Sequence, residues 1–204
     1  MIDMDAVNRE IEAGRAELAA SDKAILSLAT RRRIWEAVLD PQDDEASYRR
    51  FIELEVMCVR RVQGFWDRAF PGDDRVEEML TLAQELIDRQ ADERQAERRA
   101  RIFVMNVFDE VDDYNAITQP AVFVAQAASG AAFSACNRDP NYYLLIDDDD
   151  DDELLPDALD SSYCSASAPA GALNWQEIEK TDVPARRAFW TWYLDEAIPQ
   201  VLAD

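Results

Sequence analysis

Residues 120–136 read PAVFVAQAASGAAFSAC, and apolar side chains surround this stretch almost completely. A helix that is apolar on every side has to lie in the middle of a fold, because no face of it can be turned to water. Its alanines, its serines and Gly130 are small, so neighbouring helices can approach its backbone closely. The stretch is also shorter than the roughly 20 residues that cross a bilayer. We therefore predict that residues 120–136 form the central helix of the protein.

The segments on either side carry apolar residues at steps of three and four, the period of a helix with one buried face. None of them alternates with the period of two that is typical of strands, and residues 142–146 are the one plausible strand. We predict an all-α fold, a single globular domain over residues 1–204 that is an array of about six to eight helices. Helices besides the central one are expected near residues 7–18, 25–39, 51–69, 76–87, 100–114 and 182–198. The small residues at 161–171 could form a flexible linker or a tightly packed helix that ends near Gly171, and we favour the helix.

Several side chains are assigned to the core or to the surface by this periodicity. Cys58 and Tyr114 fall on apolar stripes and are expected to be buried. Ser21 is the expected N-cap of the second helix, and Arg31, Arg32 and Arg33 interrupt the stripe of that helix. We place these arginines on its solvent side. The C-terminal helix carries three large aromatic residues within five positions, so we expect it to dock deep in the core.

The composition excludes several classes of site. The chain has no His and three Cys, which removes His-ligated metal sites, His-based catalytic triads and four-Cys zinc sites. Cys164 therefore has no His to activate it as a nucleophile. The five glycines are too far apart for a phosphate-cradling loop. We predict no catalytic residue, no metal and no cofactor.

The charge is strongly negative, with 43 Asp and Glu against 21 Lys and Arg and a formal net charge of −22. Phosphate backbones and anionic membranes repel such a surface, so we predict neither direct nucleic-acid binding nor membrane binding. The N-terminal residues lack the basic and apolar regions of a secretion signal. A cytoplasmic protein with reduced thiols is the prediction.

The charge is also uneven, because twelve acids and no Lys or Arg lie between residues 139 and 179. Six consecutive aspartates repel one another, so residues 147–153 are expected to form an extended, solvated acidic loop. This loop could serve solubility alone or bind a basic protein; an EF-hand would require Gly where Asp152 stands and an acid where Ala158 stands. The candidate partner-binding residues are Asp147, Asp148, Asp149, Asp150, Asp151, Asp152, Glu153, Tyr142 and Tyr143, with Leu154 and Leu155 as further apolar anchors.

The C-terminal string RRAFWTWYLDEAIP, residues 186–199, resembles the signature of an all-α family of bacterial immunity proteins that are encoded beside polymorphic toxins. Two other motifs are similar to parts of the same family in the same order. They are SASAPAG at 165–171 followed by Trp175, and FPGD at 70–73 leading to Met79 and Leu80. The resemblance extends over about residues 25–204.

This resemblance implies a protein without catalytic activity that protects its producer by binding a cognate toxin domain. The expected mechanism is occlusion of a basic active-site cleft, in a toxin that acts on nucleic acid or on a nucleotide, by the acidic loop. Two alternatives stay open, an acidic nucleic-acid mimic that regulates a DNA-binding protein and an all-α enzyme that uses carboxylates. For the enzyme the candidates are Glu55, Asp109, Asp112 and Asp113, which lie beside apolar stripes.

Overall fold

The structure is a computed structural model that describes residues 1–141, 144, 150–154 and 158–203. Within these ranges the regular elements are helical and no strand is present, which confirms the all-α prediction. Residues 142–146, the one plausible strand of the sequence, lie outside the described residues except for Leu144. The main helices are α1 (Met4–Ala20), α2 (Leu28–Ala37), α3 (Asp44–Ala69), α4 (Arg75–Ile87), α5 (Glu93–Glu110), α6 (Thr118–Cys136), α7 (Ser161–Ala170), α8 (Val183–Trp192) and α9 (Ile198–Ala203). Shorter turns are η2 (Asp151–Glu153), η3 (Ile178–Lys180) and the π-turn η4 (Tyr193–Ala197).

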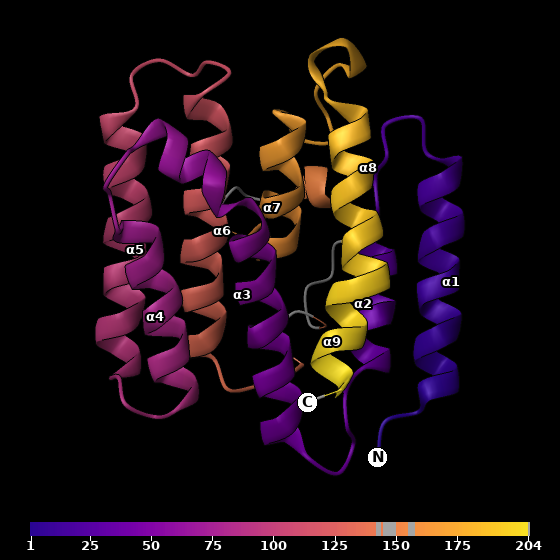
Figure 1. The fold of residues 1–204 in the computed structure, drawn as a ribbon. Coiled ribbons are helices and arrows are strands. Elements are labelled where there is room, and N and C mark those ends of the chain that lie inside the picture. The colour runs from indigo at the N-terminus through magenta and orange to yellow at the C-terminus, as the bar shows by residue number, and fades with distance from the viewer. Residues whose placement is uncertain (142–143, 145–149, 155–157, 204) are drawn as a thin grey trace.

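Helix α6 is the centre of the array, as its all-round apolar sequence predicts. It packs against α3, α4, α5 and α7, and most of its residues are buried. Figure 1 shows α4 and α5 on one side of it and α3 and α7 on the other, with α8, α2 and α1 beyond them. The apolar residues of these helices join α6 in one continuous core cluster.

Close packing at α6 depends on Gly130. A Cβ atom at this position would come within 2.9 Å of the Ser161 Oγ at the start of α7. That hydroxyl donates a hydrogen bond of 2.8 Å to the Ala127 carbonyl, so it is not free to move aside. The small residue is therefore what lets α7 lie against α6.

We expect Gly130→Ala to lower the free energy of unfolding by about 1–3 kcal/mol, because the added methyl overpacks this contact. The matched control is Gly64→Ala in α3, where no atom lies within 4 Å of the added Cβ. That change should stabilise the protein by about 0.5–1 kcal/mol, since glycine in a helix interior is unfavourable. Urea denaturation of both variants checks the prediction, and equal effects at the two sites would contradict it.

Three assignments made from the sequence differ from the structure, two at helix ends and one concerning burial. Ser21 ends α1 instead of capping the next helix, and the Ser27 hydroxyl accepts a hydrogen bond of 3.2 Å from the Thr30 N–H at the start of α2. Helix α5 ends at Glu110, so Tyr114 is exposed and not buried. Arg31 is fully buried and not on the solvent side, Arg32 is half-buried, and Arg33 is exposed as predicted.

Other sequence assignments are confirmed. Cys58 is buried, and the small residues at 161–170 form the packed helix α7, which ends at Gly171 with a φ of 63°. Glycine adopts this left-handed conformation without strain. In the C-terminal segment Phe189 and Trp190 are buried, so this helix docks deep in the core.

Candidate functional site

The acidic segment is only partly described, and its described residues divide into two kinds. Asp150, Asp152 and Glu153 are exposed. Asp151 is buried, which corrects the prediction that the whole run is solvated. The other predicted contact residues (Tyr142, Tyr143, Asp147, Asp148, Asp149 and Leu155) lie outside the described residues, and Leu154 is half-buried.

Asp151 is buried because Arg31 binds it. Arg31 is 0% exposed and holds this carboxylate with both terminal nitrogens, at 2.5 Å from Nη2 to Oδ1 and 3.1 Å from Nη1 to Oδ2. The same guanidinium reaches Asp160 Oδ2 at 2.6 Å and the Leu26 carbonyl at 2.7 Å. The bidentate geometry suits the planar fork of arginine. Arg31 thereby binds, in the core, two acids that lie 120 and 129 positions later in the chain.

Aromatic rings enclose this ion cluster. The Arg31 Cζ lies 5.5 Å from the ring centroid of Trp190 and 5.8 Å from those of Trp35 and Tyr163. Burial by itself would lower the pKa of Arg31, but Asp151 and Asp160 outweigh this and raise it. Arg31 therefore stays charged, and the rings add cation–π attraction to the ion pairs.

Asp160 connects the ion cluster to α7. Its Oδ1 accepts hydrogen bonds from the backbone N–H groups of Ser162 at 2.9 Å and Tyr163 at 3.1 Å. A carboxylate at this position caps the helix and lies at the positive end of its dipole. The extra negative charge of two aspartates against one arginine is thus partly balanced by α7.

Glu55 is a second buried acid close to this cluster, on the face of α3 that meets α6 and α7. Burial raises its pKa to about 8, and the neighbouring Ser134 and Ser161 oppose the shift only in part. Both serine hydroxyls donate elsewhere, Ser134 to the Gly130 carbonyl at 2.9 Å and Ser161 to the Ala127 carbonyl. Neither Glu55 oxygen has a well-formed hydrogen bond among the described residues. Glu55 is therefore protonated at neutral pH.

The carboxylates proposed for an enzyme are not brought together. Glu55 is buried in the core, whereas Asp109, Asp112 and Asp113 are exposed near the end of α5. Within the described ranges no three His, Cys, Asp or Glu side chains are grouped so that they could share a metal ion. Burial raises the pKa of the Cys164 thiol well above its usual value, which disfavours the reactive thiolate.

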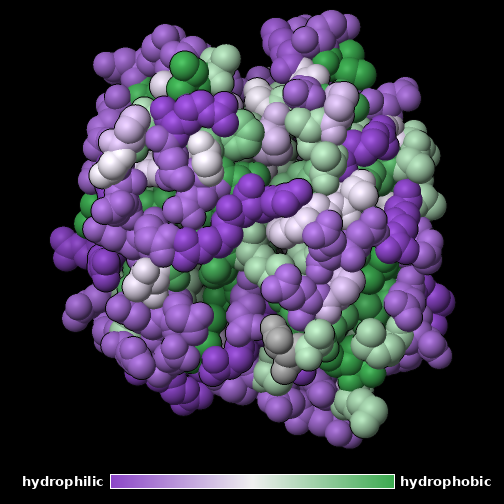
Figure 2. All heavy atoms as spheres, in the orientation of Figure 1, coloured by the Kyte–Doolittle hydropathy of each residue, from purple (hydrophilic) through white to green (hydrophobic). Residues whose placement is uncertain are grey.

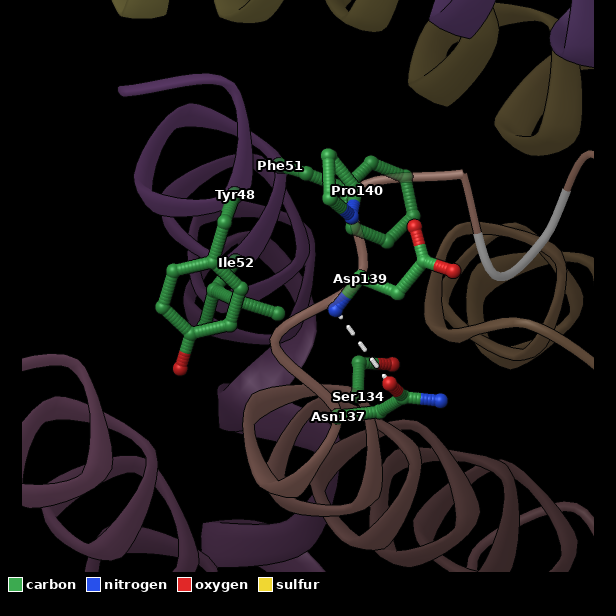
Figure 3. A pocket seen from close by; sticks show the side chains of 7 residues that line it. All are labelled: Tyr48, Phe51, Ile52, Ser134, Asn137, Asp139 and Pro140. Atoms are coloured by element: carbon green, nitrogen blue, oxygen red, sulfur yellow. Dashed lines mark hydrogen bonds between the residues drawn. The ribbon is translucent and has the colours of Figure 1, made fainter. Parts of the chain in front are cut away.

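A small hollow lies between α3 and the residues that follow α6. Figure 3 shows Tyr48 and Ile52 on one side of it and Asn137 and Asp139 on the other, with the Asp139 N–H donating to Asn137 Oδ1 at 3.2 Å. The space is about 10 Å³, which is room for about one water molecule. It is far smaller than the few hundred Å³ of a typical ligand pocket.

The outer surface carries acidic residues and a few exposed apolar side chains. Trp175 is 64% exposed and Ile178 is 41% exposed, both in the connection between α7 and α8. Tyr114 and Ile117 are exposed in the connection between α5 and α6. Figure 2 shows hydrophobic residues reaching the surface on both sides of the end of the molecule that holds these connections.

Sequence reasoning missed Arg31 and the separate role of Asp151. The available signal was position, because Arg31 lies three residues after Leu28 and three before Ile34, and both of these are buried on the same stripe. No such signal distinguishes Asp151 from the aspartates on either side of it.

The chain matches the model of a known protein family. The family model described as Immunity protein Imm5 matches residues 11–200, nearly the whole chain. No curated protein matches the chain. Within the described part of the chain, none of the helices has the length and apolar composition that a membrane crossing requires. The protein belongs to the Imm5 family of immunity proteins.

Proposed function

We propose that this protein binds a cognate toxin domain and blocks a basic active-site cleft with its acidic segment. Membership of an immunity family supports a toxin as the partner. The net charge of −22 supports a basic binding face on that toxin, since opposite potentials speed association and hold the complex. A cleft that binds nucleic acid or a nucleotide has such a face. We further infer that the protein acts in the cytoplasm and without catalysis of its own.

The observation that carries this proposal is the anchoring of the acidic segment. The Arg31–Asp151 pair fixes the middle of the segment in the core, while Asp150, Asp152 and Glu153 on either side stay exposed. A fixed display of charge loses less conformational entropy on binding than a free one. We assign Asp151 to anchoring, and the remaining acids of residues 147–153, with Tyr142 and Tyr143, to contact.

The test replaces the exposed acids while keeping the anchor, as Asp150→Asn, Asp152→Asn and Glu153→Gln together. The association rate constant with the toxin domain encoded beside this gene should fall about tenfold or more at low salt, and less at high salt, because steering is electrostatic. Surface plasmon resonance over a salt series measures this change.

A charge-matched control replaces three exposed acids on other helices, as Asp5→Asn, Asp67→Asn and Glu78→Gln. It removes the same charge from the protein without touching the acidic segment. An equal loss in both triple variants would assign the effect to net charge alone. Unchanged binding in the first variant would remove the segment from the interface.

A further inference from the structure

We propose that residues 171–182, the Trp175 loop, form a second part of the toxin interface, in which the indole of Trp175 fills an apolar pocket on the basic face of the toxin. This inference rests on the proposed function and adds an apolar anchor to the proposed toxin interface. It names a surface separate from the acidic segment, and the two make different predictions about salt.

The exposure of Trp175 sets it apart from the other tryptophans. Trp35, Trp66 and Trp190 are buried and Trp192 is half-buried, whereas Trp175 is 64% exposed. An exposed indole leaves a large apolar area in water. Tryptophan is also the residue type most enriched among side chains that dominate binding energy. Ile178, three residues later in the same loop, is also exposed, at 41%.

The backbone that carries Trp175 is held firmly from the core side. The Lys23 Nζ donates to the carbonyls of Asn174 at 3.2 Å and Gln176 at 2.8 Å, one residue on each side of Trp175. The Asn174 N–H donates to the buried Tyr163 hydroxyl at 3.0 Å. The indole therefore points to solvent from a fixed backbone, and binding does not have to order the loop first.

Two more contacts close the base of the loop. The buried Arg186 donates from Nη2 to the Ala172 carbonyl at 2.5 Å, and the Asp182 N–H donates to the Ala170 carbonyl at 2.9 Å. The loop thus begins and ends on the packed helices α7 and α8. Its outward residues are presented by a rigid support.

The charge around the loop identifies the chemistry of the partner. Glu177, Glu179 and Asp182 are exposed, and the one exposed cation of the loop, Lys180, pairs with Glu177 at 2.9 Å. Lys23 is turned inward to the loop carbonyls. An apolar anchor with an acidic rim is complementary to an apolar pocket with a basic rim.

The neighbouring connection between α5 and α6 extends this surface. The Gln119 side chain donates from Nε2 to the Gly171 carbonyl at 3.1 Å, which joins the start of α6 to the start of the Trp175 loop. The exposed Tyr114 and Ile117 lie just before it, beside the exposed Asp112 and Asp113. Figure 1 shows both connections at the same end of the molecule, opposite to the first residues of α1.

The experiment measures the affinity of the full-length protein for the toxin domain encoded beside its gene, by isothermal titration calorimetry. Trp175→Ala is expected to raise the Kd about 30-fold or more, as for a dominant anchor, and Ile178→Ala about fivefold. The loss should persist at high salt, because the contact is apolar. The control is Met4→Ala, a 48% exposed side chain at the opposite end, which should leave the Kd unchanged.

Both loop side chains are exposed, so the variants should unfold at the temperature of the wild type, which a thermal scan checks. Wild-type affinity in Trp175→Ala and in the double variant Trp175→Ala/Ile178→Ala would overturn this inference while leaving the proposed function in place. Failure of the wild-type protein to bind or neutralise the toxin would overturn the proposed function itself. A Kd increase that disappears at high salt would also count against an apolar anchor.

Discussion

Replacement of Arg31 by Met is expected to lower the free energy of unfolding by about 3–5 kcal/mol, a large share of the roughly 5–15 kcal/mol that stabilises a typical domain. The variant leaves Asp151 and Asp160 buried with no cation between them, and both are at most 3% exposed. An uncompensated buried charge costs far more than the loss of a surface pair. Urea denaturation monitored by far-ultraviolet circular dichroism measures the change.

The matched control is Arg33→Met on the same helix. Arg33 is half exposed and pairs with Glu10 at 3.0 Å, so its loss should change the free energy of unfolding by less than about 1 kcal/mol. Adding Asp151→Asn to Arg31→Met should restore part of the stability, because it removes one of the two stranded charges. Additive losses in the double variant would show that Arg31 and Asp151 do not act as a pair.

The second large effect concerns pH. Glu55 has a pKa of about 8 in the folded protein against a reference value of 4.5, with burial as the main cause and the nearby Asp160 adding to it. Between these two pH values the folded state holds a proton that the unfolded state has released. The free energy of unfolding should therefore fall as pH rises from about 4.5 to 8, by about 3–5 kcal/mol from this group, and level off above that.

The variant Glu55→Gln isolates this contribution, because glutamine has nearly the shape of a protonated glutamate and does not ionise. Its stability relative to the wild type should be about equal near pH 5 and should increase steadily toward about pH 8.5. Other titrating groups are common to both proteins and cancel in the difference. A stability difference that is constant over this pH range would show that Glu55 does not titrate between the two states.

Local sequence patterns were sufficient to predict most of the fold. The apolar residues at 120–136 predict a central helix, because exposing any face of this segment to water would be unfavourable. Apolar residues at steps of three and four positions predict α3, α4 and the C-terminal helix, because this spacing gives each helix one apolar face that has to be buried. The run of small residues at 161–171 was compatible with a linker as well as with a helix, and the structure shows the helix α7, which ends at Gly171. The predicted start of α2 was wrong, because two nearby serines could cap this helix. Ser27 caps it, and Ser21 ends α1 instead.

The site could be predicted less well, because its features depend on contacts between distant residues. Burial of Arg31 requires two acids more than a hundred positions away, and one-dimensional spacing carries no information about them. The exposure of Trp175 likewise depends on Lys23 and Tyr163 holding the loop backbone from other parts of the chain. Its large apolar side chain favours burial when the sequence is considered alone. The family was suggested mainly by the resemblance at residues 186–199, since fold and charge are shared by many unrelated proteins.

The ion pair between Arg31 and Asp151 gives chemically identical aspartates different structural roles. Asp151 binds Arg31 in the core, whereas the neighbouring Asp150 and Asp152 are exposed. Because every position of the run of six carries the same side chain, insertion or deletion of one aspartate codon would still leave a carboxylate able to occupy the place opposite Arg31. The length of the outward part of the segment could therefore change without loss of the ion pair.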